Sequence, residues 1–508
     1  MEILGQVDLP LNLLLTIVAA CLIYTYGTWD YDYFKKLGIP GPKPYPLIGC
    51  SIGFSFYPKF PSWKQKYGRV FGIFMGNQKA LVISDPDILK EVLVKSFNTF
   101  RNRMKVPMIP FPLNLGLFFL DDAQWKRVRS ITSPGFSSSK LRLMCVAINE
   151  CATTLVKNFS KVVGNNKAVN MKEYFGAYTM DVISRTAFGV KVDSQNDFDN
   201  PFVANAKEIF KHTSARRLLP IIAGLMPRLA RALRKRGFGI YPQSVMTFFR
   251  RNITEMIDEQ KQQTREKQKQ TNYILQRLLD PAQIAIRDDN DYTANGESKK
   301  GTVRGLSTDE VVGQGINFFA AGFETTASTL TFASHSLAVN PDIQEQVYNE
   351  IKEMIGNEEP NYDNIGKLKY LDNVITETLR LYPPVIALHR RASEDIQIKG
   401  LTIQKGHTIF IPVFAMQRDP EFFKKPDSFR PERHDEHSHP LSFLAFGYGP
   451  RKCIGMRLAL IEAKIALVHL LRTVKLECLP GTQEVLTFKN TNFLQADKEI
   501  RLKLSSRC

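Results

Sequence analysis

The chain has 508 residues, of which 68 are basic and 50 acidic, and its formal net charge is +18. A chain of this length could hold about three average domains, but no repeat or low-complexity linker divides it, so we expect one large catalytic unit. The basic residues are spread along the chain without a zinc-finger, RRM or homeodomain signature, which argues against nucleic acid as a partner. Seven scattered cysteines without a CxxC pair indicate a reducing compartment.

The N-terminal segment has the composition of a membrane span. Residues 9–26 are uncharged and mostly apolar, and with the next two residues they approach the ~20 needed to cross a bilayer. Glu2 and Asp8 disfavour a cleaved signal peptide, which usually has a basic start. Lysines follow the span, so the positive-inside bias places the bulk of the protein in the cytosol. We therefore predict an N-terminal transmembrane helix, with a buried core helix as the alternative.

A proline-rich stretch from Pro40 to Pro46 follows the span and predicts a stiff, extended connector. These observations divide the chain into three parts. We expect a membrane anchor over residues 1–28, a hinge over residues 29–50 and a catalytic domain over residues 51–508.

A long helix is predicted near the middle of the chain. Ser307 and Glu310 form a capping box, and an apolar, Gly- and Ala-rich pattern then continues to about Val339, before Asn340-Pro341 ends it. Some 30 residues at 1.5 Å each give a rod of about 45–50 Å, which is long enough to cross a domain.

The centre of this helix carries the sequence Ala321-Gly322-Phe323-Glu324-Thr325-Thr326. A hydroxyl in mid-helix competes with the backbone hydrogen bonds, and Gly322 weakens the helix further. Residues that weaken a helix in this way often lie at functional sites. The alternative is a notch of small residues that packs against a neighbouring helix.

Two charged residues, Glu377 and Arg380, lie three positions apart on one face of a helix that Pro383-Pro384 ends. Arg433 follows downstream in a Pro-Glu-Arg sequence. Between them, residues 392–412 alternate around glycine turns and predict short antiparallel strands, and residues 485–504 are similar.

The run from His434 to His439 contains three histidines and two carboxylates, the residue types that bind zinc. It lacks the helical H-E-x-x-H spacing and lies in a loop, which disfavours a metallohydrolase.

The most informative segment runs from Phe446 to Gly455 and places Cys453 on a glycine-bent loop just before a predicted helix. Free N–H groups and the helix dipole at such a position are expected to lower the pKa of the thiol, so we predict a thiolate. A lone thiolate suits a metal whose other ligands come from a macrocycle. A buried, inert cysteine is the alternative.

The pattern F-x-x-G-x-R-x-C-x-G resembles the haem-binding loop of the cytochromes P450 at every defining position. The sequence A-G-x-E-T-T resembles the oxygen-activating motif of that family, and E-x-x-R with the later P-E-R resembles its Glu–Arg–Arg triad. The closest likeness is to the animal family-3 group, which includes thromboxane synthase. The implied fold is mainly α (α+β), a large helical domain with a long central helix and a small antiparallel β portion.

The resemblance implies haem b with Cys453 as its axial thiolate ligand and metal-binding residue. Glu324 and Thr325 would deliver protons, and Glu377, Arg380 and Arg433 would form the structural triad. His434 departs from the family, which usually has Phe there. The haem would also contact Arg103, Trp125, Arg129, Arg390 and Arg451, with Arg391 as an alternative to Arg390. The substrate pocket would be lined by Phe118, Phe119, Ala320, Ala321, Val385 and Ile386.

These residues predict a monooxygenase that inserts one oxygen atom of O2 into a lipophilic steroid, fatty acid or xenobiotic. Electrons would come from NADPH through the separate NADPH–cytochrome P450 reductase, because no G-x-G-x-x-G fingerprint is present. Cytochrome b5 is a second candidate partner. We expect a single-pass endoplasmic reticulum protein with a cytosolic catalytic domain. A haem-thiolate isomerase acting on a lipid peroxide and a haem-binding carrier are the alternatives.

Overall fold

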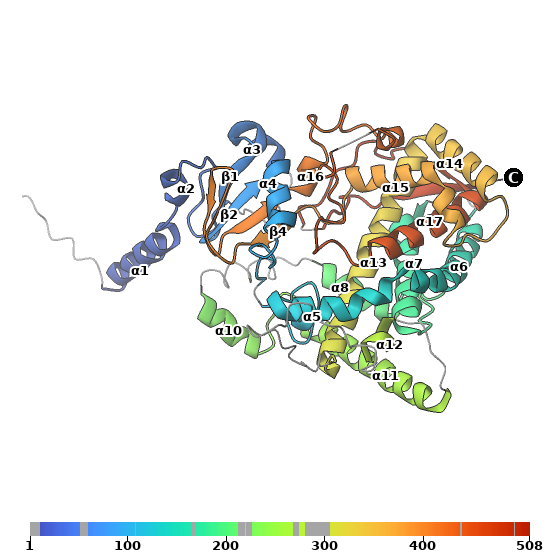
Figure 1. The fold of residues 1–508 in the computed structure, drawn as a ribbon, viewed down its shortest axis with the longest axis horizontal. Helices are drawn as coiled ribbons and strands as arrows, with labels where there is room; N and C mark the ends of the chain where they lie inside the picture. The colour runs from blue at the N-terminus through green and yellow to red at the C-terminus, as the bar shows by residue number, and fades with distance from the viewer. Residues whose placement is uncertain are drawn as a thin grey trace, which may run out of the picture.

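A computed structural model describes residues 11–50, 59–106, 108–164, 168–211, 219, 226–267, 274–279, 305–436, 439–491 and 493–507. Most of these residues are helical, and the main sheet lies at one side of the molecule (Figure 1), apart from a second sheet of β3, β9 and β8. The helices are α1 Leu11–Thr28, α2 Tyr33–Lys36, α3 Phe60–Tyr67, α4 Pro86–Lys90, α5 Asp122–Thr132, α6 Ser138–Ser160, α7 Met171–Ile183, α8 Pro201–Phe210, α10 Pro227–Lys235, α11 Gln243–Lys267, α12 Ile274–Leu279, α13 Thr308–Val339, α14 Pro341–Met354, α15 Lys369–Leu381, α16 Val413–Met416 and α17 Met456–Thr473.

The main sheet has the strand order β1-β2-β7-β4, in which the β2–β7 pair is parallel and the other two pairs are antiparallel. The hairpin predicted within residues 392–412 forms as β5 and β6, with Ile396 opposite Ile403. Residues 485–500 form isolated bridges, and regular pairing resumes only at β9. The strands are β1 Val70–Met75, β2 Gln78–Ile83, β3 Val169–Asn170, β4 Leu388–Arg391, β5 Ile396–Ile398, β6 Leu401–Ile403, β7 Thr408–Ile411, β8 Val474–Glu477 and β9 Arg501–Ser506.

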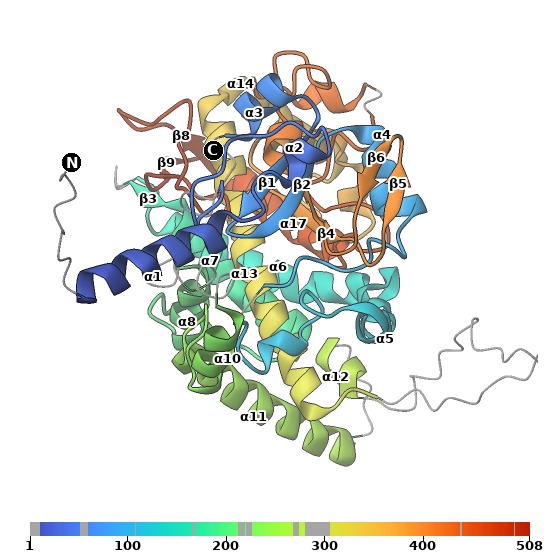
Figure 2. The ribbon, with the colours of Figure 1, turned by 90° about the vertical axis from the view of Figure 1, so that its left-hand side faces the viewer.

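The long central helix is α13, and it begins and ends where the sequence predicts. The amide of Glu310 donates to Ser307 Oγ at 3.2 Å, and the amide of Ser307 donates to Glu310 Oε2 at 2.9 Å, which completes the capping box. Asn340 caps the other end, where Pro341 opens α14. Figure 2 shows α13 in yellow, crossing the helical part of the molecule.

The interior is built around α13, which is buried along most of its length and packs extensively against α7. The rings of Phe188 and Phe319 stack with centroids 4.4 Å apart. A Cβ on Gly322 would come within 3.0 Å of Ile183 on α7, so the glycine permits a close approach of these two helices. The predicted packing notch therefore exists at Gly322, beside the polar residues that follow it.

The N-terminal helix α1 is exposed from Leu11 to Tyr26, whereas Gly27 is buried and Thr28 is half-buried. It is long and apolar enough to cross a membrane, and no other helix in the described ranges meets that test. Residues 29–50 contain the short helix α2 and pack on the main sheet, where the rings of Tyr31 and Phe74 lie 4.9 Å apart. The division into anchor, hinge and catalytic domain stays a prediction.

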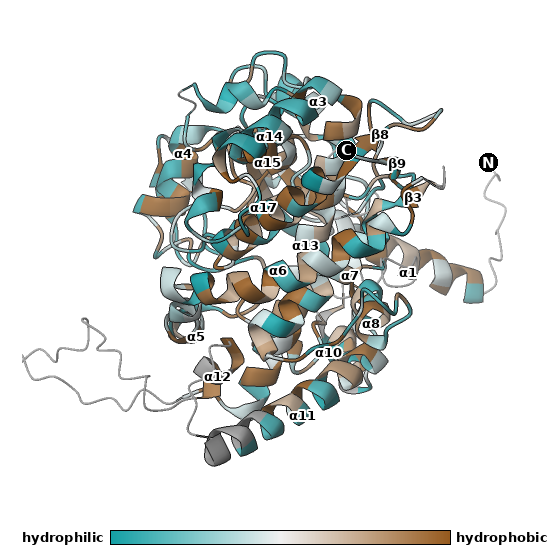
Figure 3. Cartoon of the chain, turned by 90° about the vertical axis from the view of Figure 1, so that its right-hand side faces the viewer, coloured by the Kyte–Doolittle hydropathy of each residue, from teal (hydrophilic) through white to brown (hydrophobic). Residues whose placement is uncertain are grey.

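Helix α17 follows the cysteine loop and is apolar along much of its length, whereas hydrophilic residues dominate α14 (Figure 3). Helix α17 nevertheless carries Glu462, whose side chain is buried in the core and only 5% exposed. Within the described part of the chain, Glu462 Oε1 has no hydrogen-bond partner, and burial raises the pKa of this carboxyl well above its usual value. Burial therefore favours the protonated form of the Glu462 carboxyl in the folded protein.

We expect Glu462→Gln to reduce the loss of stability that accompanies a rise in pH. Above the usual pKa of about 4.5, an unfolded Glu462 is ionised while the folded one keeps its proton, so the free energy of unfolding falls by up to about 1.4 kcal/mol per pH unit. Glutamine does not titrate, so Glu462→Gln removes this dependence of the free energy of unfolding on pH. Denaturation midpoints measured from pH 5 upward should diverge in favour of the variant, whereas the exposed control Glu353→Gln should follow the wild type. Parallel curves for the wild type and Glu462→Gln would contradict the protonated state.

Candidate active site

The cysteine loop is shaped by two glycines with left-handed backbone. Gly447 and Gly449 have φ values of 72° and 73°, which side-chain-bearing residues rarely adopt. A Cβ on Gly449 would also overlap the carbonyl of Leu93, so the loop must approach that backbone closely. The amide of Cys453 donates to Phe446 O at 2.9 Å and closes the loop just ahead of α17.

Cys453 is accessible to solvent, yet protein surrounds it closely enough for burial to raise the pKa of its thiol. The amide of Gly455 donates to the sulfur, and the cations Arg129 and Arg103 also favour the thiolate, but burial outweighs them. The predicted lowering of the pKa by the helix end is therefore wrong for the protein alone.

Two half-buried arginines from separate segments, Arg103 and Arg129, lie close enough to this sulfur for their charges to favour its thiolate. Arg103 donates to Phe118 O at 3.1 Å and lies over the ring of Phe118, 4.1 Å from its centroid. Arg129, on α5, donates to Lys452 O at 3.0 Å, within the cysteine loop itself. Burial lowers the pKa of Arg103 to about 10, and the charge of Cys453 opposes that shift.

Two further arginines are almost fully buried and only partly hydrogen-bonded. Arg451 donates to Leu120 O at 2.8 Å and stacks over Trp125, 4.4 Å from the ring centroid. Arg390 donates to His389 O at 2.8 Å. Among the described residues, Arg451 Nε, Arg451 Nη1 and Arg390 Nε have no acceptor. Burial and repulsion from neighbouring arginines lower their pKa values, to about 8 for Arg451 and about 9 for Arg390.

Tertiary packing distinguishes Arg390 from its neighbour. Arg391 pairs with Asp121 at 2.9 Å and has a carboxylate partner, whereas Arg390 repels Arg103 inside the cluster. His389 also faces this cluster; burial and the charges of Arg103 and Arg390 lower its pKa to about 3, so it is neutral. His389 belongs to no motif, so its place in this cluster could not be predicted from the sequence.

The acid and hydroxyl of the central motif have different partners. Glu324 is buried and pairs with Lys172 of α7 at 2.9 Å, and Gln495 donates to its Oε1 at 3.4 Å. Thr325 Oγ1 donates to Ala321 O at 2.6 Å, the i−4 bond that a mid-helix hydroxyl is expected to make. Lys172 and Gln495 were missed because both lie more than a hundred residues away in the chain.

The predicted triad is assembled and gains a fourth member. Arg380 donates to both carboxylate oxygens of Glu377 at 2.7 and 2.8 Å, and Arg433 donates to Oε1 at 2.9 Å. His434 Nε2 lies 2.9 Å from Oε2. Although burial alone would raise the pKa of Glu377, the hydrogen bonds from Arg380 and His434 bring it down to about 2.

His434 therefore serves the triad in this structure. No group of three or more potential metal ligands occurs in the ranges the structure describes, and His437 and Ser438 lie outside them. The metallohydrolase alternative gains no support.

The expected substrate-pocket residues come from three segments, one of which is α13 itself. The loop before Phe118 is fixed to that helix because Leu117 N donates to Gln314 Oε1 at 2.8 Å and Gln314 Nε2 donates to Leu115 O at 2.6 Å. Gln314 is thus a further residue that sequence reasoning missed. Phe118 and Ala321 are exposed, Ile386 is buried, and Phe119, Ala320 and Val385 are half-buried.

A single sulfur leaves most of a metal's coordination sphere open, and the unpaired arginine N–H groups need anionic acceptors at fixed places. In haem, the ring nitrogens occupy the remaining coordination positions of the metal, and the propionate carboxylates accept hydrogen bonds from arginines. The residues present therefore fit this group. The fold and the site together define a haem-thiolate enzyme.

Comparison with known proteins agrees with that class. Residues 39–504 match the family model described as Cytochrome P450, and the chain belongs to the cytochrome P450 family. It is 37% identical to mouse cytochrome P450 3A13 over 96% of this chain and 95% of the relative. It is 36% identical to human cytochrome P450 3A5, with 97% and 96% covered, and 37% identical to the lithocholate 6-beta-hydroxylase of Mesocricetus auratus, with 100% and 99% covered.

These relatives agree with the predicted likeness to the animal family-3 group. The predicted mainly helical fold and the haem-thiolate monooxygenase class are confirmed. Membership also implies redox partners and lipophilic substrates in general.

Proposed function

We propose that the protein is a membrane-anchored monooxygenase that inserts one oxygen atom of O2 into a lipophilic substrate, with NADPH electrons delivered by NADPH–cytochrome P450 reductase. The observation that carries this proposal is Thr325, a half-buried mid-helix hydroxyl on α13 that follows directly after the buried carboxylate of Glu324. An enzyme that only rearranges a peroxide would not need this hydroxyl for proton delivery. Cytochrome b5 is a second candidate donor.

We assign the haem contacts from the arginine cluster. Cys453 would hold the haem iron through its thiolate, and Arg103, Arg129, Arg390 and Arg451 would bind the propionates, with Trp125 stacked under Arg451. Haem bound in this way would supply the electron-transfer and oxygen chemistry. Glu377, Arg380 and Arg433 would hold the core on the cysteine side.

Proton delivery would use the polar residues of α13. Lys172 and Gln495 hold the Glu324 carboxylate in place, and Glu324 would pass protons through water to Thr325 Oγ1, which faces the substrate pocket in this proposal. The pocket would be lined by Phe118, Phe119, Ala320, Ala321, Val385 and Ile386. Aromatic and aliphatic walls favour a steroid, fatty acid or xenobiotic. The name of the lithocholate 6-beta-hydroxylase puts steroids first among these.

The anchor would be α1, crossing the endoplasmic reticulum membrane once and leaving the catalytic domain in the cytosol. Its exposed apolar surface and the lysines after it support this orientation. We also expect the apolar residues 218–226 to make a second membrane contact; these residues lie almost wholly outside the described part of the chain. The helix that follows them, α10, exposes Leu229 and several arginines, but its Ala230 packs on Met108.

We expect Thr325→Ala to retain haem and substrate binding while diverting electrons into hydrogen peroxide. The reason is that the substitution removes a hydroxyl that is needed for proton delivery but not for binding. Positioned proton donors accelerate a reaction by about 10²–10⁴-fold. NADPH consumption, peroxide release and product should be measured together with reductase and a panel of steroids, fatty acids and xenobiotics.

Thr331→Ala is the matched control, since Thr331 Oγ1 makes the same i−4 bond, at 2.6 Å to Ala327 O, farther along α13. The control should stay coupled. Unchanged coupling in Thr325→Ala would remove the assigned role. A wild type active only on lipid peroxides without NADPH would indicate the isomerase, and one without turnover on any substrate would indicate the carrier.

A further inference from the structure

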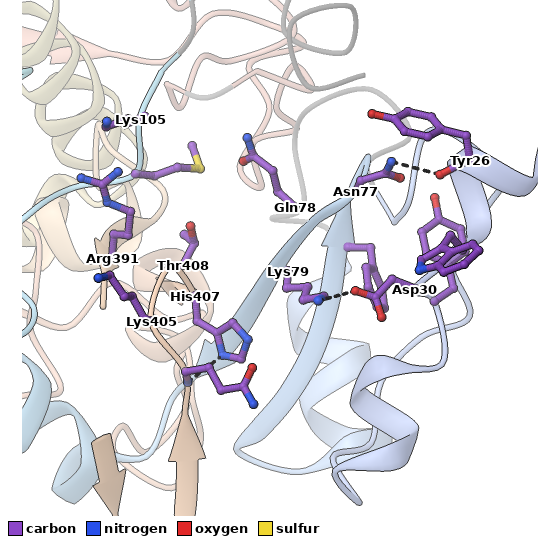
Figure 4. A pocket seen from close by; sticks show the side chains of 16 residues that line it. Tyr26, Asp30, Asn77, Gln78, Lys79, Lys105, Arg391, Lys405, His407 and Thr408 are labelled. Atoms are coloured by element: carbon purple, nitrogen blue, oxygen red, sulfur yellow. Dashed lines mark hydrogen bonds and ion pairs between the residues drawn. The ribbon is translucent and has the colours of Figure 1, made fainter. Parts of the chain in front are cut away.

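A pocket of about 750 Å³ lies where the candidate membrane span meets the main sheet, apart from the cysteine loop. One wall is the end of α1 and the residues after it, and another is the turn between β1 and β2. Figure 4 shows Tyr26 and Asp30 on one side of the pocket, with Lys105, Arg391 and Lys405 across from them. The proposed chemistry of the haem site uses none of these residues.

The end of α1 is fixed to the body of the protein beside this pocket. Asn77 Nδ2 donates to Tyr26 O at 3.3 Å, and Asp30 forms an ion pair with Lys79. Gly27 is buried against Leu47, where a Cβ would overlap the leucine side chain. These contacts hold the pocket at a fixed depth relative to the span.

The rim of the pocket has the composition of a membrane–water interface. Trp29 is 82% exposed and Tyr26 is 59% exposed, at the end of the apolar helix where aromatic residues concentrate in membrane proteins. Figures 1 and 2 both place α10, with its exposed arginines, on the same side of the molecule as α1. If α1 crosses the bilayer as proposed above, the pocket lies at the level of the lipid headgroups.

The charges of the lining are mostly positive. Four cationic side chains, Lys79, Lys105, Arg391 and Lys405, face one carboxylate, Asp30. Lys79 pairs with Asp30 and Arg391 pairs with Asp121, whereas Lys105 and Lys405 are exposed, and no ion pair engages them among the described residues. Two cations therefore remain for a ligand that carries negative charge.

We propose that this pocket binds the phosphate headgroup of an anionic phospholipid from the leaflet that receives the cytosolic end of α1. Lysines beside a membrane span attract anionic lipids, and a basic pocket at that level can hold one headgroup. Trp29 and Tyr26 would contact the glycerol and upper acyl region, because their rings are amphipathic. The proposal rests on the membrane anchoring by α1.

The test uses the full-length haem protein in nanodiscs of phosphatidylcholine with a minority of phosphatidylserine. Native mass spectrometry of the extracted protein measures how much phosphatidylserine stays bound. The pocket variant Lys105→Glu/Lys405→Glu is compared with Arg231→Glu/Arg234→Glu on α10, which makes the same charge change on the same side. We expect the pocket variant to retain phosphatidylserine on the order of tenfold less than the wild type, and the control to retain it.

Equal retention by the wild type and the pocket variant would overturn the proposal, and so would an equal loss in the control, which would indicate diffuse attraction to a basic face. A third arm offers inorganic phosphate to the detergent-solubilised protein; phosphate binding without phosphatidylserine retention would assign the pocket to a soluble ligand. Incorporation into the discs tests the anchoring separately. The reduced, carbon-monoxide-bound spectrum of each variant reports on the haem site.

Discussion

Cys453→His is expected to abolish the red-shifted Soret band of the reduced, carbon-monoxide-bound protein and, with it, monooxygenase activity. Cys453 is the one cysteine on the loop that Gly447 and Gly449 shape, and the amide of Gly455 points at its sulfur. Histidine can still ligate iron, but it lacks the electron density of the thiolate that favours O–O cleavage. Haem content and the carbon-monoxide difference spectrum should be measured on the same preparation.

The control for this experiment is Cys478→His, because Cys478 is also an exposed free cysteine but lies beyond α17. It should keep both the band and the activity. A Cys453→His protein that keeps the red-shifted band would show that another residue is the ligand. Loss of haem without loss of folding would agree with the assignment, since the ligand anchors the group.

Glu377→Gln is expected to destabilise the folded protein by about 3–5 kcal/mol, the cost of leaving buried partners uncompensated. Arg380 and Glu377 are fully buried and Arg433 nearly so, and all their mutual hydrogen bonds lie between 2.7 and 2.9 Å. Glutamine keeps the shape of the side chain but removes the charge that both arginines face. The urea midpoint and the fraction of protein that retains haem report the loss.

Glu255→Gln is the matched control for this charge removal. Glu255 pairs with Arg251 at 2.9 Å, and both side chains are more than half exposed, so its removal should cost no more than about 1 kcal/mol. Equal effects of the two substitutions would mean that the triad contributes no more than a surface ion pair.

Local signals were sufficient for several parts of this protein. The capping box at Ser307 and the Asn340-Pro341 stop act within a few residues, so the limits of α13 could be predicted from the sequence. Gly447 and Gly449 take the left-handed backbone that only glycine adopts readily, so the loop around Cys453 could be predicted as well. Glu377 and Arg380 are neighbours on one helix turn, and their pairing follows from that spacing.

Other features depended on contacts between distant segments. Arg390 and Arg391 are adjacent in sequence, and only the position of Asp121 shows which of them is paired. Glu324 gains Lys172 and Gln495 from separate elements, and His434 turns toward Glu377 instead of a metal. No local sequence pattern predicts partners that come from distant segments of the chain.

The pKa of Cys453 shows most directly how local signals differ from contacts between distant segments. Glycines and a helix start are local properties of the chain, so the position of the sulfur on its loop follows from the sequence. Whether its pKa rises or falls was decided by tertiary structure, since the desolvation of a thiol depends on every segment packed around it, and here that desolvation outweighs the local backbone donor.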